Sequence, residues 1–167
     1  MDIVVNDTNI FIDLCKLNLL DEVFQLPLGM HTVDFVIREL REEQKEMVCA
    51  FSESGQLVVH SFTSNEISEI IELKDEAGGN VSITDCSAWY YAKVNKYTLL
   101  TGDGQLRKKA SASDVIVKGI LYLFDLLVSE GILSRENAAI KLKELIGINH
   151  RLPRKEMDAR IDRWESM

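Results

Sequence analysis

Short apolar runs alternate with segments of helical periodicity along most of this chain. The first run, residues 3–5, is followed by apolar side chains at Ile10, Phe11 and Leu14, which recur at helical spacing. Continuous apolar runs of this kind are typical of strands buried on both faces of a parallel sheet. Strands that alternate with helices therefore predict an α/β fold, with a parallel sheet covered by helices on both faces.

The expected elements follow from this alternation and from capping and breaking residues. Asp34, either Thr63 or Ser64, and Ser82 are placed to cap helices, and glycines close several segments. The expected strands are residues 3–5, 30–33, 57–59, 98–101 and 113–117. The expected helices are a first one fading near residue 20, a short turn at 21–25, and helices at 34–53, 64–77, 82–95, 104–109, 119–129 and 134–146, with a further helix at 153–164.

Composition limits the kinds of protein that fit. With 167 residues, 46% of them hydrophobic, the chain can fill one core, and we expect one domain. Cys15, Cys49 and Cys86 show no C-x-x-C spacing, which favours reduced core cysteines over disulfides or a zinc site. No signal peptide or membrane span is visible, so we expect a cytoplasmic protein without a membrane partner. The net charge of −8 means that any nucleic-acid contact must come from local basic patches.

Four acidic residues stand near the ends of predicted strands. Asp7 directly follows the first strand and Asp103 follows the strand at 98–101. Glu39 lies about one turn into the helix after the second strand, and Asp85 lies in the first turn of its helix. The carboxyl ends of parallel strands form the ligand crevice of such folds. Carboxylates that converge there repel one another and raise their pKa values unless a cation neutralises them.

Each acid also has a purely structural interpretation. Asp7 and Asp103 are good N-caps, and Ser82 with Asp85 matches a capping box. Glu39 fits an exposed helix position near basic residues. The functional interpretation therefore depends on all four acids meeting at one place.

A hard divalent cation suits such a group of acids. Mg²⁺ and Mn²⁺ prefer oxygen ligands, use one or two protein carboxylates per ion, and complete their shell with water and substrate phosphate. Such a site hydrolyses a phosphodiester without a protein nucleophile. His31, His60 and His150 are scattered, and the chain has neither an H-E-x-x-H motif nor a serine elbow, so the other common hydrolytic sites are disfavoured.

Four segments of the chain resemble the acidic blocks of PIN-domain nucleases in order, spacing and flanking residues. They are Asp7-Thr8-Asn9, Arg38-Glu39-Leu40, Ile83-Thr84-Asp85-Cys86-Ser87-Ala88 and Thr98-Leu99-Leu100-Thr101-Gly102-Asp103-Gly104-Gln105-Leu106-Arg107-Lys108-Lys109-Ala110. The last segment is the most specific of the four. The resemblance implies a Rossmann-like α/β/α sandwich with a short parallel sheet over residues 1–132. Residues 133–167 are then a C-terminal helical extension, which we expect to pack on the same domain.

The resemblance also implies an activity and a site. The activity is that of an endoribonuclease dependent on Mg²⁺ or Mn²⁺, and many similar bacterial members are VapC-type toxins, paired with a small antitoxin and often dimeric. The catalytic and metal-binding residues would be Asp7, Glu39, Asp85 and Asp103. Thr8 and Thr101 would orient these acids or the substrate. Contacts to the RNA backbone are expected from Arg38, Arg107 and Lys108.

Two features around this site have competing interpretations. Trp89 lies one helical turn after Asp85, where it can either stack on an unpaired base or belong to the core. The helix at 153–164 carries Met157, Ile161 and Trp164 on one face, which favours docking on the body of the protein. Its many basic residues also suit a phosphate backbone or an acidic partner.

Two other classes of protein compete with the nuclease. In a PIN-fold protein-interaction module without nuclease activity, the acids serve only as caps and the C-terminal part binds a partner. The other class is a phospho-transfer domain, such as a receiver or a haloacid dehalogenase-type phosphatase. In the latter, a second acid and a hydroxyl follow the first aspartate. Asn9 and Phe11 occupy those positions here, so the third interpretation is the least favoured.

Overall fold

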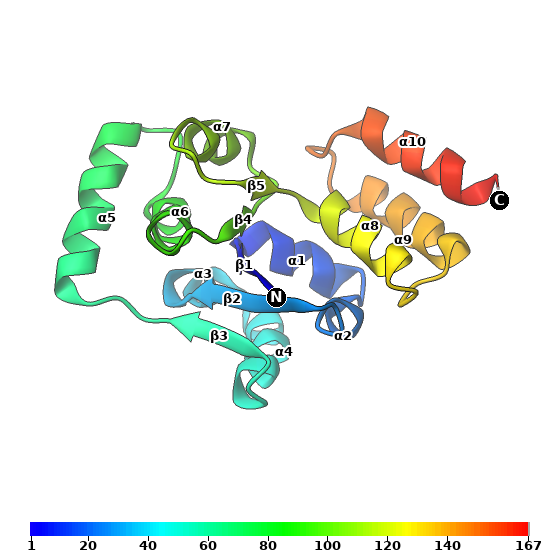
Figure 1. The fold of residues 1–167 in the computed structure, drawn as a ribbon, viewed down its shortest axis with the longest axis horizontal. Helices are drawn as coiled ribbons and strands as arrows, with labels where there is room; N and C mark the ends of the chain where they lie inside the picture. The colour runs from blue at the N-terminus through cyan, green and yellow to red at the C-terminus, as the bar shows by residue number, and fades with distance from the viewer. Residues whose placement is uncertain (167) are drawn as a thin grey trace.

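The computed structural model describes residues 1–166, in which five strands form a single sheet in the order β3-β2-β1-β4-β5. All four strand pairs are parallel, and β1 lies at the centre between β2 and β4 (Figure 1). The strands are β1 (Asp2–Asn6), β2 (Leu28–Val33), β3 (Leu57–His60), β4 (Thr98–Leu100) and β5 (Val117–Lys118). The expected α/β fold with a short parallel sheet is therefore confirmed.

Helices cover both faces of this sheet. Figure 1 shows α5, α6 and α7 on one side of the strands, with α1, α4, α8 and the C-terminal helices on the other. The helices are α1 (Thr8–Lys16), α2 (Leu20–Val23), α3 (Asp34–Glu39), α4 (Glu42–Glu53), α5 (Ser64–Ala77), α6 (Ile83–Asn95), α7 (Gly104–Ala112), α8 (Ile120–Ser129), α9 (Arg135–Ile148) and α10 (Arg154–Glu165).

The central strands form the middle of the core. Val4 and Val5 on β1 and Leu99 and Leu100 on β4 are completely buried, as their continuous apolar runs predict. Two predicted caps are also confirmed. Thr63 accepts a hydrogen bond from the backbone of α5, and Ser82 does so for α6, each within a full capping box.

The predicted helix at 34–53 is wrong in one respect, because the chain forms two helices there. Leu40 is extended (ψ 146°) and its side chain is buried, so the chain turns between α3 and α4 to bring this residue into the core. The backbone N–H of Arg41 then donates to Gln44 Oε1 (3.2 Å), which caps the start of α4. Asp34 is not a cap. It is the first residue of α3, and Val33 holds the cap position.

Two other boundaries differ from the prediction. The first helix ends at Lys16, before Asn18 with its positive φ of 55°, and not near residue 20. In the predicted strand at 113–117, Ser113 instead caps the C-terminal end of α7 and Asp114 has a φ of 67°. The left-handed backbone at Asp114 prevents strand pairing, so only Val117–Lys118 pairs with β4.

The C-terminal helices dock on the body of the molecule. Asn149 Nδ2 donates to Asp13 Oδ2 on α1 (2.9 Å), and Lys141 Nζ donates to the carbonyl oxygen of residue 17 (2.8 Å). Arg160 on α10 makes a two-pronged ion pair with Asp125 on α8, with both N–O distances at 2.8 Å. Met157, Ile161 and Trp164 are buried. The docked-helix interpretation of residues 153–164 is therefore confirmed.

Two further expectations concern cysteines and membranes. All three cysteines are free thiols, with Cys15 and Cys86 buried and Cys49 half-buried. Within residues 1–166, none of the helices has both the length and the apolar character that a membrane crossing requires.

Candidate active site

Asp7 lies at the carboxyl end of the central strand and is almost completely buried, with 2% of its surface exposed. Its backbone N–H donates to the carbonyl oxygen of Leu100 (3.0 Å), which extends the β1–β4 pairing by one step. Its Oδ1 accepts from the backbone N–H of Thr8 (2.9 Å) and so caps α1. A carboxylate is therefore held in the interior, at the edge of the sheet where ligands of such folds bind.

Thr101 joins the segments that carry two of the predicted acids. Its hydroxyl donates to Asp7 Oδ2 (2.7 Å) and accepts from the backbone N–H of Asp103 (3.1 Å). Thr101 is itself completely buried, so its bond to Asp7 is shielded from water, while its bond to the backbone of Asp103 is partly buried. Asn9 adds a second link, because its Oδ1 accepts from the backbone N–H of Gly102 (3.0 Å).

Glu39 is linked to the same place from the other side. It is the last residue of α3, a helix that contacts both α1 and α6, and its side chain is exposed. Thr8 donates its hydroxyl to Glu39 Oε1 (2.9 Å). The two predicted orienting threonines thus each hold one predicted acid, Thr101 holding Asp7 and Thr8 holding Glu39.

Electrostatic effects show that the four acids share one region. The pKa of Asp7 is raised to about 7, first by burial and then by the negative charges of Asp85 and Glu39, while hydrogen bonds from Thr101 and Thr8 lower it. The pKa of Asp85 is also raised, first by burial and then by the charges of Asp103 and Glu39, while hydrogen bonds from Ser82 lower it. The structure therefore brings the predicted acids within electrostatic reach of one another.

The acids do not form a closed ligand cage. Within residues 1–166, no three Asp, Glu, His or Cys side chains stand close enough together to hold an ion. Besides Asp7, two more of the acids make capping bonds: Asp85 Oδ2 accepts from the backbone N–H of Ser82 (2.9 Å), and Asp103 Oδ1 accepts from those of Gln105 and Leu106 (2.8 and 3.0 Å). These hydrogen bonds confirm that the acids occupy capping positions.

The donor set nevertheless fits a hard cation. Mg²⁺ and Mn²⁺ typically take only one or two protein carboxylates and keep several waters, so a closed cage is not required. Asp7 is a buried carboxyl whose ionised form is disfavoured by burial and by two neighbouring acids. A divalent cation beside Asp7 would offset both effects.

Replacing Thr101 with Val tests whether this hydroxyl holds the site together. The variant leaves Asp7 Oδ2 without its donor and the N–H of Asp103 without its acceptor, in a buried region. We expect a loss of about 1–3 kcal/mol in the free energy of unfolding, measured by urea denaturation of the metal-free protein. Thr98→Val is the matched control, because the half-buried Thr98 makes no side-chain hydrogen bond within the described residues. Equal losses in the two variants would contradict this role of Thr101.

The predicted RNA-contacting residues differ in their surroundings. Arg38 pairs with Asp34 (3.0 Å) and lies over a phenylalanine ring, so its charge is already partnered. The guanidinium of Arg107 lies over Gly119, where a Cβ atom would approach Arg107 Nη2 to 2.9 Å. Lys108 is exposed on α7. Of the three, Arg107 is the one placed beside Thr101, since both line the same cavity.

Trp89 belongs to the core, as the structural interpretation predicted. It is 5% exposed and its ring N–H donates to Ser113 Oγ (2.9 Å), so stacking on a base is excluded for this side chain in the structure. Sequence reasoning gave no role to Asn9, although it lies within the first resembling block. Only the fold shows that Asn9 holds the loop that carries Asp103.

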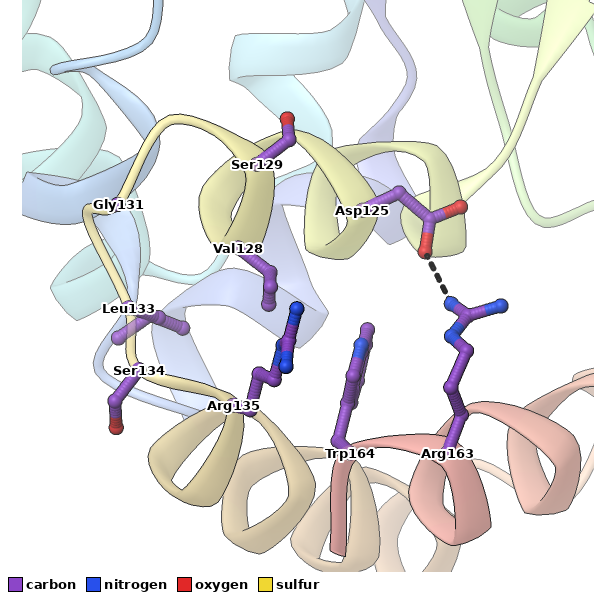
Figure 2. Close-up of a pocket in the computed structure, with 9 residues that line it drawn as sticks. All are labelled: Asp125, Val128, Ser129, Gly131, Leu133, Ser134, Arg135, Arg163 and Trp164. Carbon is purple, nitrogen blue, oxygen red and sulfur yellow. Dashed lines mark ion pairs between the residues drawn. The ribbon is translucent and has the colours of Figure 1, made fainter. Parts of the chain in front are cut away.

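A cavity of about 670 Å³ lies elsewhere, between α8 and the C-terminal helices. Figure 2 shows Trp164 and Arg135 beside this space, with Asp125 and Arg163 facing each other in an ion pair (3.8 Å). None of the four predicted acids lines this cavity. The size of a cavity therefore does not locate the candidate site, which is identified by the four acids at the carboxyl edge of the sheet.

Comparison with known proteins identifies the family of this chain. A sequence profile of the family described as PIN domain (DUF3368) matches residues 3–166. No curated protein matches the chain in sequence.

Several solved structures are similar to this chain at low identity. VapBC2 from Rickettsia felis, bound to a DNA fragment from its promoter, is 14% identical with a TM-score of 0.47, over 70% of this chain and 98% of that one. A PilT N-terminus domain protein from Sulfolobus solfataricus P2 is 13% identical with a TM-score of 0.47, over 75% and 93%. FitAcB from Neisseria gonorrhoeae is 16% identical with a TM-score of 0.41, over 68% and 95%.

Proposed function

The chain belongs to the PIN-domain family, and from this premise we propose that it is a metal-dependent endoribonuclease. The proposed substrate is RNA and the proposed reaction is hydrolysis of a phosphodiester bond. Asp7, Glu39, Asp85 and Asp103 are the proposed catalytic and metal-binding residues. The proposed cofactor is Mg²⁺ or Mn²⁺, because hard cations prefer carboxylate oxygens.

One observation carries this proposal. Asp7 is a carboxyl buried to 2% exposure at the carboxyl edge of the sheet, with a pKa raised to about 7 and with Asp85 and Glu39 among the causes. Burying an acid among other acids is unfavourable, and a carboxyl with a pKa strongly perturbed by burial and neighbouring charges is a candidate functional residue. Asp103 acts on the same group through Asp85.

The residues of the chain have separate tasks in this proposal. When bound, the divalent cation supplies charge neutralisation and activates the hydrolytic water. Thr101 keeps Asp7 oriented by donating to Oδ2, and Thr8 keeps Glu39 oriented by donating to Oε1. The buried position of Asp7 excludes bulk water from one side of the site. These contacts hold the acids in place before a substrate binds.

Family membership also motivates proposals about partners. VapC-type members work as toxins with a small antitoxin and often as dimers. We propose the same arrangement for this chain, with the C-terminal extension, residues 133–167, as part of the same folded unit. Co-purification with a neighbouring gene product and the oligomeric state in solution test these two points.

The alternative is a PIN-fold interaction module without nuclease activity. The observation that favours it is the capping role of Asp85 and Asp103, together with the absence of a closed ligand cage within residues 1–166. Asn caps a helix nearly as well as Asp. The module therefore predicts that Asp103→Asn leaves every property nearly unchanged.

Cleavage of an end-labelled pool of single-stranded RNAs tests the nuclease directly. We expect cleavage with Mn²⁺ or Mg²⁺, none with chelator, and none by Asp103→Asn protein purified in parallel. Cleavage that persists in chelator, or in the variant at the wild-type rate, would overturn the proposal. If neither metal causes cleavage and neither raises the melting temperature of the wild type, the interaction module becomes the better account.

A further inference from the structure

A cavity of about 650 Å³ adjoins the loop that carries Asp103. It lies between the start of α7, strand β5 with the start of α8, and the segment that joins α9 to α10. Thr101, which holds Asp7, lines it, so the cavity begins at the candidate active site. The residues used below are Gly102, Arg107, Lys118, Gly119, Arg151 and Leu152.

The C-terminal part of the chain forms one wall of this cavity. Leu152 lies against the active-site loop, where a Cβ atom on Gly102 would be 3.6 Å from Leu152 Cδ2. Arg151 also lines a second cavity, of about 460 Å³, which contains Asp103. Arg151 therefore stands where the two cavities meet, beside a predicted catalytic acid, although it is 48 positions further along the chain.

Arg151, which lies just before α10, differs from the arginines of that helix in its charge partners. Arg154 pairs with Asp158, and Arg160 and Arg163 pair with Asp125. The charges of these three arginines are therefore already paired with carboxylates of the same chain. The tail as a whole is therefore not a free basic surface, and Arg151 is the arginine of residues 151–163 that has no ion pair in the described structure.

Two more cations without ion pairs line the same cavity. Within residues 1–166, neither Arg107 nor Lys118 has an acidic partner, although Lys118 Nζ lies 5.8 Å from the centre of a tyrosine ring. All three cations are exposed. Glu156 is the acid at the rim that has no ion pair there, because Asp125 is held by arginines. In a chain with a net charge of −8, three unpaired cations at one cavity are a local basic patch.

We propose that this cavity binds the phosphate backbone of the RNA next to the scissile bond, with Arg107, Lys118 and Arg151 contacting phosphates. The inference rests on the proposed function and adds a role for residues 151–152, which complete the groove. Phosphate contacts of this kind set the register of the strand without reading its sequence. Gly119 forms part of the lining, and its missing side chain lets the guanidinium of Arg107 pack closely against the backbone there.

Binding of a fluorescent single-stranded RNA in chelator, followed by anisotropy across a range of salt concentrations, tests the groove without any chemistry. Each phosphate contact contributes about −0.7 to the slope of log K against log salt. We therefore expect Arg151→Ala, Lys118→Ala and Arg107→Ala each to make the slope shallower by about 0.7. The corresponding loss of affinity at 0.1 M salt is about fivefold.

Lys45→Ala is the control variant. Lys45 lies on α4, which contacts the opposite edge strand β3, and its only described ion pair is with Glu42. We expect the salt slope and the RNA affinity of Lys45→Ala to match those of the wild type. Unchanged melting temperatures in all four variants would confirm that they fold.

The outcomes separate the groove from the nuclease. Wild-type slopes in the three groove variants, or no RNA binding by the wild type in chelator, would overturn the groove even if metal-dependent cleavage is observed. Shallower slopes in those variants, together with cleavage that is insensitive to Asp103→Asn, would support the groove and overturn the four-acid site. Equal losses in Lys45→Ala would show general charge attraction and contradict a defined groove.

Discussion

Replacing Asp7 with Asn is expected to abolish metal-dependent RNA cleavage and at the same time to stabilise the metal-free protein above pH 7. The loss of cleavage follows from the proposed role of Asp7, because stabilisation by a metal ion is worth several kcal/mol in the transition state. This corresponds to at least about a hundredfold decrease in rate. The gain in stability follows from removing a carboxylate that is 2% exposed and surrounded by other acids.

The pH dependence of this effect has a definite sign. The pKa of Asp7 is raised from 3.8 to about 7 in the folded protein, so the folded state binds the proton more tightly than the unfolded state does. The stabilisation that comes from protonated Asp7 is fully present below pH 4 and is lost as the pH rises through 7. At 1.36 kcal/mol per pKa unit, the wild type should lose about 4 kcal/mol over this range through Asp7 alone.

Urea denaturation at several pH values, with chelator present, measures this effect. The stability of Asp7→Asn relative to wild type should increase between pH 4 and pH 8. Mn²⁺ should raise the melting temperature of the wild type in proportion to occupancy but leave the variant unchanged.

Asp13→Asn is the matched control for these measurements. Asp13 lies on α1 and, like Asp7, is a buried carboxyl whose pKa is raised by burial. Its side chain is hydrogen-bonded to Asn149 and does not face the other acids. Asp13→Asn should therefore keep the Mn²⁺ response. A wild-type melting curve that does not respond to millimolar Mn²⁺ would contradict a metal site at Asp7.

Replacing Trp164 with Ala is expected to destabilise the whole protein by about 3–5 kcal/mol. Trp164 is 4% exposed and stacks with Phe124 on α8, with ring centroids 6.4 Å apart. Removing the indole leaves a cavity between α10 and the body of the protein. Since we propose that residues 133–167 fold with the nuclease domain as one unit, the loss should appear in a single cooperative transition.

Urea denaturation followed by circular dichroism measures this loss. Ile140→Ala is the control, because Ile140 is also a large hydrophobic residue near the C-terminus but is 49% exposed on α9. Its effect should stay within about 0.5 kcal/mol. An early separate unfolding step in Trp164→Ala, with the main transition unchanged, would show that the C-terminal helices form an independent unit.

The local parts of this fold could be read from the chain. Apolar runs indicated the buried strands, and hydroxyl residues at Thr63 and Ser82 indicated helix starts, because capping depends on residues only three positions apart. The break at Leu40 was missed. A helix-compatible periodicity continues through it, and the turn exists because the core takes up this side chain.

The sequence by itself determined the α/β class, the alternation of strands and helices, and the placement of Asp7 directly after a strand. These properties depend on short-range patterns of apolar, polar and capping residues. Only the tertiary structure decided which side chains meet. The bond from Thr101 to Asp7 spans 94 positions, and the approach of Leu152 to Gly102 depends on how α9 and α10 dock. No periodicity encodes such contacts, because they result from packing the whole core at once.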